Sequence, residues 1–202
     1  MGWVLMVFQS RQRSLMLTLL KSLVIPPLEY CYQLWNPWKA KYIKAIEVIQ
    51  RTFTYKITEV QYLNYRERLH ELNLCSLQCR HERYIIIYIW KITQHMVPNI
   101  DDTKWHTIKI RKHPRHGTQC VIQYPTNRNP AQSLQENAIT AFGPRLYNSL
   151  PKYPRDIEIL SVKTEKFKFE LDKFLELIPD QPKMPKYVTA SGSNSILDQL
   201  TI

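Results

Sequence analysis

The stretch that decides the fold is residues 76–96, SLQCRHERYIIIYIWKITQHM. At the spacing i, i+4, i+7 and i+11 it carries Ile85, Ile89, Ile92 and Met96. Three consecutive isoleucines would also suit a strand, because β-branched side chains favour extended backbone. The long periodic flanks favour a helix instead. Since apolar residues occupy its other sides as well, we expect this helix to be buried at the centre of the fold, with Ser76 as its N-cap.

Shorter helices are expected on the amino-terminal side of this one. A helix capped by Ser10 should run to about Val24 and stop at Pro26–Pro27, where a second short helix begins. The second helix is expected to carry inward Leu28, Cys31 and Leu34. Each of these helices buries one apolar face and leaves the other face polar.

The clearest of the earlier helices covers about residues 39–57. One of its faces carries Ile43, Ile46, Ile49, Gln50 and Phe53, and the opposite face carries Lys41, Lys44 and Arg51. After a break near residues 61–64, residues 65–72 predict one more short helix, which turns Leu69 and Leu72 inward.

A different pattern follows Val97–Pro98, which ends the helical half. Two short strands are expected at about residues 107–111 and 119–124, separated by a turn of His, Pro and Gly. One or two helical turns at residues 145–150 should begin at Gly143–Pro144 and end at Pro151. A last helix, about residues 161–178, aligns Phe167, Leu171, Phe174 and Ile178.

These elements together predict a mainly α fold. We expect a helical bundle in residues 1–97, a small irregular α+β extension in residues 98–178, and a disordered, flexible tail in residues 179–202. With 202 residues of which 44% are hydrophobic, the chain can form one or two small cores.

Positive charge is concentrated in one short segment. The net charge of the chain is +11, and residues 104–155 contain nine Lys or Arg against one Asp or Glu. The candidate binding residues there are Lys109, Arg111, Lys112, His113, Arg115 and His116, flanked by Trp105 and Tyr124. A solvated loop can have the same composition, but this concentration of cations favours contact with phosphates, with Lys41, Lys44 and Arg51 as a second basic face.

No catalytic site is predicted. Asp101–Asp102 imitates the paired carboxylates of a nucleotidyl-transfer site, but Asn99 stands where an aromatic residue is expected and no third carboxylate lies in a comparable strand upstream. The motifs of serine hydrolases, zinc proteases and phosphate-binding loops are absent from the sequence, which has only 4 Gly. We therefore expect no enzymatic activity, no cofactor and no small-molecule substrate.

Zinc ligation is the alternative that the residues leave open. Ligands could come from Cys75, Cys79, His81, His113, His116 and Cys120. Their spacing departs from a zinc knuckle, because Cys75 and Cys79 fall on or beside a helix at i, i+4. Buried cysteines beside loop histidines explain the same residues, so the zinc-dependent interaction module stays a second hypothesis.

The sequence favours an intracellular protein, nuclear or cytoplasmic. The first eight residues, MGWVLMVF, lack the basic start and cleavage site of a signal peptide, and the longest apolar run is short of a membrane span. We expect no membrane contact. Because the chain is already hydrophobic at its start, we also expect it to be a piece of a longer coding frame.

Several strings, in this order, resemble the carboxy-terminal part of non-LTR (LINE-type) retrotransposon reverse transcriptases. They are RQRSLMLTLLKSLVIPPLEYCYQLWNP (residues 11–37), IEVIQRTFTYKI (46–57), residues 69–77 with 80–83, FGPRLYNSLP (142–151), the helix at 167–175 and SNSILDQL (193–200). The resemblance covers nearly the whole chain.

The resemblance implies a thumb that grips a primer–template duplex, followed by a carboxy-terminal extension. In that family the polymerase palm and an endonuclease lie upstream of such a region, and this sequence contains neither, nor the Cys-Cys-His-Cys knuckle of some relatives. The implied partners are nucleic acid, bound without sequence preference, and the rest of a reverse transcriptase. A third interpretation is a structural relic without any function.

Overall fold

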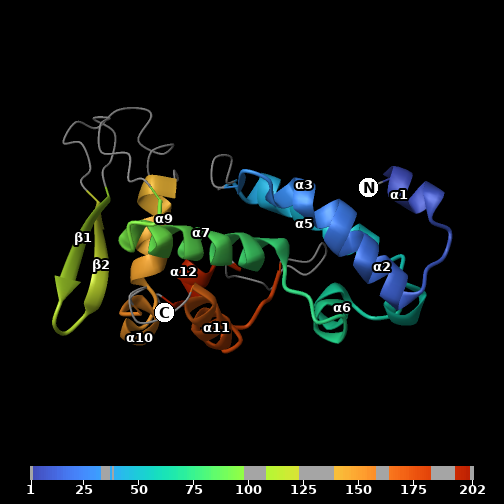
Figure 1. Cartoon of the computed structure of the whole chain (residues 1–202). Coiled ribbons are helices and arrows are strands. Elements are labelled where there is room, and N and C mark those ends of the chain that lie inside the picture. Colours follow the sequence, from blue (N-terminus) through green and yellow to red (C-terminus); the bar gives the residue numbers. More distant parts are fainter. Residues whose placement is uncertain are drawn as a thin grey trace. The chain divides into compact units, whose positions relative to one another are not determined.

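The chain forms two compact units in a computed structural model, which describes residues 2–32, 37, 39–97, 108–122, 139–157, 164–182 and 194–200 (Figure 1). Within these residues the fold is mainly helical with one two-stranded antiparallel sheet, which confirms the predicted fold class. The first unit comprises Met1–His81 and Asp180–Asn194, and the second Glu82–Pro179 and Ser195–Ile202. This grouping differs from a division after residues 97 and 178 because helix α7 (Leu77–Thr93) contributes residues to both units.

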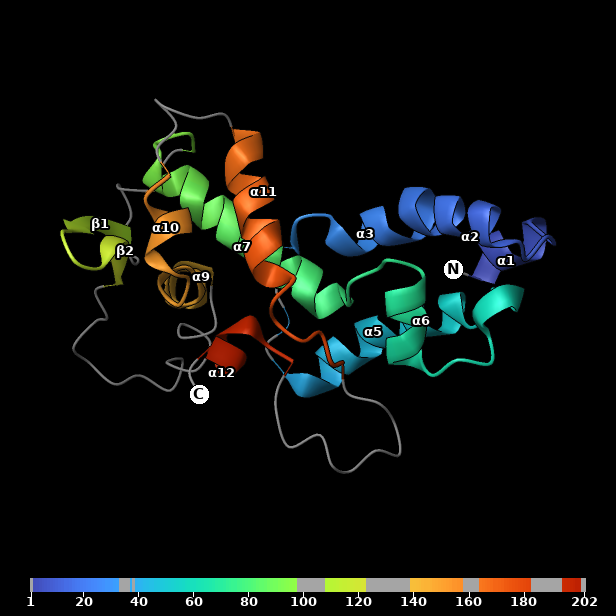
Figure 2. The same ribbon diagram turned by 90° about the horizontal axis from the view of Figure 1, so that it is seen from below.

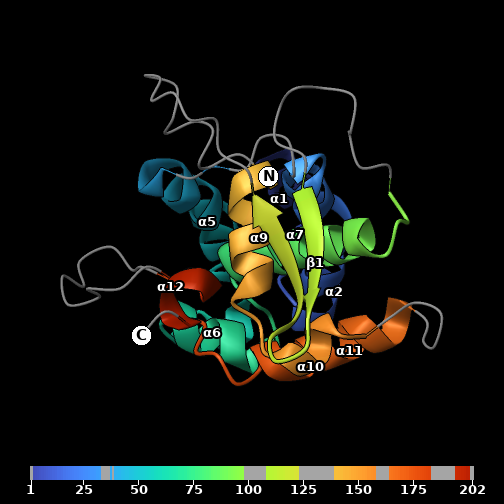
Figure 3. The same ribbon diagram turned by 90° about the vertical axis from the view of Figure 1, so that its left-hand side faces the viewer.

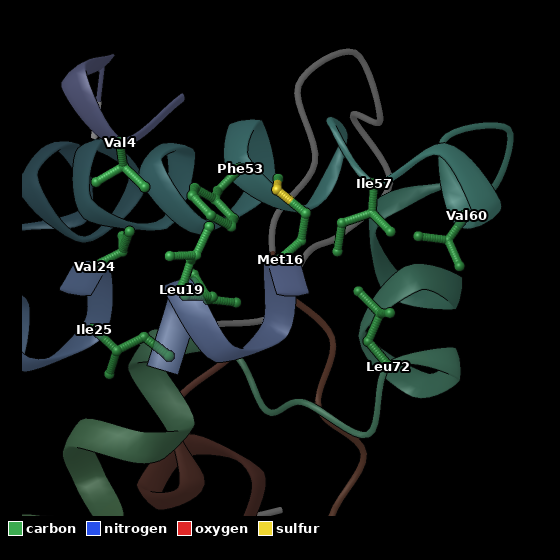
Figure 4. Packing of buried hydrophobic residues seen from close by; sticks show 10 residues of the cluster. Val4, Met16, Leu19, Val24, Ile25, Phe53, Ile57, Val60 and Leu72 are labelled. Carbon is green, nitrogen blue, oxygen red and sulfur yellow. The ribbon is translucent and has the colours of Figure 1, made fainter. Parts of the chain in front are cut away.

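The first unit is a set of short helices around an apolar cluster. Its elements are α1 (Gly2–Val7), α2 (Arg13–Leu19), a π-helical turn η1 (Leu20–Val24), α3 (Ile25–Glu29), α5 (Ala40–Thr54), the 3-10 turn η2 (Thr58–Val60) and α6 (Tyr65–Glu71). Buried side chains meet between α2–α3 and the segment from α5 to α6, among them Met16, Phe53 and Leu72 (Figure 4). Burial of these side chains supplies the main stabilisation of the unit.

The first helical stretch ends at Val24 and a second short helix, α3, begins with prolines in its first turn, as predicted, but the backbone stays helical across the junction. The π turn η1 precedes them, and the N–H of Ile25 donates to the carbonyl of Leu20, five residues back. A proline ring clashes with the carbonyl four residues earlier, and a widened turn relieves that clash. As a result α2, η1 and α3 follow one another along nearly one line (Figure 2).

Two expectations for this region are wrong. Ser10 does not cap α2, since Gln12 holds the N-cap position and no side chain makes a capping hydrogen bond there. Cys31 is exposed and not inward, because the backbone leaves the helix at Tyr30 and Cys31 takes a positive φ of 50°. Leu34 lies outside the described residues.

Helix α6 begins and ends close to its predicted limits. The Asn64 side chain accepts a hydrogen bond from the N–H of Glu67, and the Glu67 carboxylate accepts one from the N–H of Asn64, which completes a capping box. Leu69 and Leu72 are buried, as their spacing predicts.

The central helix α7 confirms the choice of helix over strand for the isoleucine run. Six of its apolar side chains are buried, namely Ile85, Ile86, Ile87, Ile89, Trp90 and Ile92. Ser76 acts as the predicted cap, with its hydroxyl accepting from the N–H of Cys79 at 3.2 Å. Met96 lies beyond the end of the helix and is exposed.

The second unit combines the remainder of α7 with short helices and a hairpin, and β2 of the hairpin packs on α9 and α10. Its other elements are β1 (Ile108–His113), β2 (Gly117–Ile122), α9 (Ile139–Asn148), α10 (Lys152–Arg155), α11 (Thr164–Leu175) and α12 (Ile196–Leu200). The rings of Trp90 and Phe167 stack at 4.4 Å between centroids, and the indole N–H donates to the carbonyl of Ile157 at 3.0 Å. Both predicted strands are present, with bounds shifted by one to two residues, and they pair antiparallel.

Helix α9 begins earlier than its sequence suggests. It starts at Ile139, and Pro144 lies inside it, whereas the Gly-Pro pair was expected to begin the helix. Gly143 lies so close to α7 that a Cβ atom there would come within 2.9 Å of Cγ1 of Ile89. Close packing of α9 on α7 therefore outweighs the local tendency of proline to end a helix.

The expected disordered tail is corrected in part. Helix α12 occupies Ile196–Leu200, its first residue is buried, and it packs against α9. The N–H of Ile196 donates to the Glu82 carboxylate at 2.6 Å, and the Ile196 side chain is buried, so both contribute to the order of α12. Residues 183–193 lie outside the described part of the chain.

A buried carboxylate joins three helices of the first unit. Glu47 of α5 is only 8% exposed, and it accepts hydrogen bonds from the hydroxyl of Tyr65 and from the N–H of Leu77 at the start of α7. Burial raises the pKa of Glu47 to about 7, and the nearby Asp180 carboxylate adds to this rise, whereas the hydrogen bond from Tyr65 opposes it. Between pH 4.5 and about 7 the Glu47 carboxyl therefore keeps a proton in the folded unit that it releases in the unfolded chain.

Because folding raises the pKa of Glu47, the stability of the protein should depend on pH through this residue, and Glu47→Gln should remove that dependence. The pKa is raised from 4.5 to about 7, so the stabilising contribution of the Glu47 proton is fully present below pH 4.5 and is lost as the pH rises through 7. The free energy of unfolding of Glu47→Gln relative to the wild type should grow by about 3 kcal/mol between pH 4.5 and pH 8. Urea unfolding followed by circular dichroism measures the difference.

The same chemical change at an exposed position serves as the control. Glu176 is exposed, so Glu176→Gln should follow the wild-type pH profile. A pH profile of Glu47→Gln parallel to that of the wild type would show that Glu47 has an ordinary affinity for protons.

Candidate nucleic-acid interface

The predicted basic residues lie on a hairpin with two different faces. The strand register places Lys109 opposite Val121 and Arg111 opposite Gln119. Directly opposed residues lie on one side of a sheet. Lys109 and Arg111 are exposed and Val121 is 38% exposed, so this side of the hairpin, the outer face, points to solvent.

The other side of the hairpin packs on α9 and α10, as Figure 3 shows for the hairpin and α9. This inner face includes Ile108, Thr118 and Cys120, all of them buried. Strand alternation also assigns Lys112, which is opposite Thr118, to the inner side, although it is exposed near the turn. Lys112 therefore does not share a surface with Lys109 and Arg111.

The turn of the hairpin is organised by His113. Its Nδ1 atom accepts hydrogen bonds from the backbone N–H groups of Arg115, at 3.2 Å, and His116, at 3.3 Å. The two histidine rings lie 4.8 Å apart. The backbone at Arg115 is thereby held in the turn, and its exposed side chain lies at the tip of the hairpin.

Side chains from α9, α10 and Asp156 form hydrogen bonds with the edge of β2 that does not pair with β1. The side-chain amide of Asn148 accepts from the N–H of Cys120 at 2.9 Å and donates to the carbonyl of the same residue at 2.8 Å. Two residues along, the N–H of Thr118 donates to Asp156 at 2.8 Å, and its carbonyl accepts from Arg155 at 3.1 Å. These bonds replace the third strand that the edge lacks.

The cations of the outer face have no acidic partners in the described chain. Ion pairs among the described residues join Arg13 to Glu71, Arg80 to Glu29 and Arg83 to Asp172. Lys109, Arg111 and Arg115 take part in no ion pair among the described residues. Their charge therefore remains available to an anionic ligand.

A second basic face lies on α5 in the first unit. Lys41 and Lys44 are exposed, whereas Arg51 is half-buried. The only carboxylate of this helix is Glu47, which faces the interior, so none offsets the lysines along α5 itself. The exposed rings of Tyr42 and Tyr55, which the sequence pattern did not single out, lie on the same helix and directly after it.

The described residues offer no metal site. Within these ranges no three side chains of His, Cys, Asp or Glu gather in a way that could hold a metal ion. Burial raises the pKa of the Cys120 thiol to about 12, which disfavours the thiolate that zinc binds. Asp101–Asp102, Trp105 and Tyr124 lie outside the described part of the chain.

The residues that the sequence analysis missed are the ones that hold the hairpin. Asn148, Arg155 and Asp156 carry no pattern of their own in the sequence, since their role depends on where β2 lies. Gly117 marks the end of the turn, but its role becomes clear only from the structure. Its φ of +70° requires a residue that tolerates the left-handed region.

The chain matches no protein-family model, no curated protein and no solved structure. In the part of the chain that the structure describes, none of the helices has the length and apolar character that crossing a membrane requires.

Gly117→Ala should loosen the hairpin. A Cβ atom at this position would lie 2.9 Å from Cγ of Asp156, and the positive φ adds strain, so we expect a loss of about 2 kcal/mol of unfolding free energy. Urea unfolding measures this loss of stability. The Thr118 amide donates to Asp156, so its faster hydrogen exchange would show that the contact with Asp156 is the one that weakens.

Gly2→Ala is the matched control, because a Cβ atom at Gly2 has no neighbour within 4 Å. Equal stability of the two variants would contradict the close contact between Gly117 and Asp156.

Proposed function

We propose that this chain binds nucleic acid through the phosphate backbone and that the outer face and turn of the β1–β2 hairpin form the contact surface. The observation that supports the proposal is the set of exposed cations Lys109, Arg111 and Arg115, which have no carboxylate partner in the described chain. Lys and Arg side chains that neutralise phosphates release condensed counterions, and this release drives binding without regard to base sequence.

The rigidity of the hairpin adds to its suitability. An isolated two-stranded hairpin is only marginally stable in water, and its cations would lose conformational freedom on binding. Here the bonds from Asn148, Arg155 and Asp156 fix β2 before any ligand arrives. The surface therefore needs little reorganisation to meet a phosphate backbone.

Helix α5 offers a further basic surface. Lys41 and Lys44 can contact phosphates, and the exposed ring of Tyr42 can stack on an unpaired base. Arg51 contributes less than its sequence position suggests, because its side chain is half-buried.

The resemblance to non-LTR retrotransposon reverse transcriptases gives this binding a context. In that context the chain corresponds to a thumb and carboxy-terminal extension, has no polymerase activity of its own, and acts with the rest of a reverse transcriptase in the nucleus or cytoplasm. A zinc-dependent module is the less favoured function, because the described residues form no metal-binding cluster.

The proposal predicts a strong dependence of binding on salt. Replacing Lys109, Arg111 and Arg115 together by alanine removes up to three phosphate contacts. The slope of log K against log salt for duplex DNA should then become less negative by about 2 to 3, since each contact contributes about 0.9. Fluorescence anisotropy with a labelled duplex at several salt concentrations measures both slopes.

The control variant carries the same number of charge removals on α11, at Lys166, Lys168 and Lys173. It should bind with nearly the wild-type slope. Equal slopes for the hairpin variant and the wild type would contradict the proposal, and complete lack of binding by the folded wild type would favour a relic without function.

A further inference from the structure

The outer face of the hairpin carries more than phosphate-binding charge. Arg111 and Gln119 oppose each other across the two strands, and Lys109 and Val121 form the neighbouring pair. Directly opposed side chains start about 5 Å apart, so Arg111 and Gln119 can reach a common ligand. Neither Gln119 nor Val121 is suited to bind a phosphate by charge, so counterion release alone gives these residues no role.

Arginine and glutamine are the side chains that recognise purine edges in the major groove. The guanidinium fork can donate to O6 and N7 of guanine, and the glutamine amide can pair with N6 and N7 of adenine. An apolar side chain such as that of Val121 can contact the methyl group of thymine. The outer face thus presents one cation for the backbone and three side chains suited to bases.

The shape of the hairpin also fits one kind of nucleic acid. A two-stranded ribbon, with strands about 4.8 Å apart, can enter the major groove of B-form DNA, which is about 12 Å wide. The deep, narrow major groove of A-form RNA does not admit it. Because the inner face of the hairpin packs on α9 and α10, the outer face is the side that can approach such a groove.

Single-stranded nucleic acid is less well suited to this surface. Stacking on unpaired bases requires exposed rings, and within residues 108–122 the only rings are those of His113 and His116. The His113 ring is engaged with the turn amides. The hairpin therefore has little to offer an unpaired base.

We propose that the hairpin enters the major groove of B-form duplex DNA and that Arg111 and Gln119 contact base edges there. This inference rests on the proposed function and adds to it the class of nucleic acid and a preference for particular base pairs. Lys109 and Arg115 would contact the flanking phosphates in the same complex.

The test compares duplexes that differ only in the major groove. Fluorescence anisotropy at fixed salt should show about tenfold weaker binding to a duplex whose cytosines carry glucosylated hydroxymethyl groups, which fill the major groove. Netropsin, which fills the minor groove, should leave binding unchanged. Duplex RNA of the same sequence should bind about tenfold more weakly than duplex DNA.

Two variants separate base contact from charge. Arg111→Lys keeps the charge but loses the planar fork, and Gln119→Ala removes the amide. In a selection from randomised duplexes, each should lose the base preference of the wild type at one position and keep its salt slope. Lys166→Ala, at an exposed position of α11, should keep both the preference and the slope.

The outcomes distinguish the inference from the proposed function. Equal binding to unmodified and glucosylated duplexes, together with a salt slope that still depends on Lys109, Arg111 and Arg115, would overturn groove entry and leave backbone binding intact. A salt slope that is independent of those three residues would overturn both.

Discussion

The side-chain amide of Asn148 pairs with the backbone of Cys120, and the presentation of the basic hairpin depends on this pair of hydrogen bonds. Two strands alone bury too little surface to be stable. Asn148 takes the place of a neighbouring strand at Cys120, and Arg155 and Asp156 do the same at Thr118. Without these contacts the backbone N–H and C=O groups at the free edge of β2 would be unsatisfied, and the cations would not share a fixed surface.

Periodicity made α5, α6, α7 and α11 predictable. The spacing of Ile85, Ile89 and Ile92 was enough to identify α7, because a helix buried on all sides leaves a dense apolar pattern. The start of α9 was not predictable, because it depends on how closely Gly143 approaches α7. The inward direction of Glu47 was hidden for a similar reason: its partners, Tyr65 and Leu77, are distant in the sequence.

The candidate site was predictable in its composition but not in its geometry. A count of charges identified residues 109–116, since Lys and Arg are concentrated there. Only the strand register separates Lys109 and Arg111 from Lys112 and brings Gln119 beside Arg111. A one-residue shift of that register would move every side chain of the strand to the other face. The composition of the segment therefore does not predict which cations lie together.

The π turn at Leu20–Val24 sets the rotational phase between α2 and α3. Each residue of an α-helix advances the chain by about 100°, and the wider turn takes up one residue more than a regular α-helix would. Deleting one residue from this turn would give a more regular helix and yet a poorer fold. With Ile25 in place, α2 would then be rotated by about 100°, and Met16 and Leu19 would no longer face Phe53. The length of this segment therefore matters more than its exact composition.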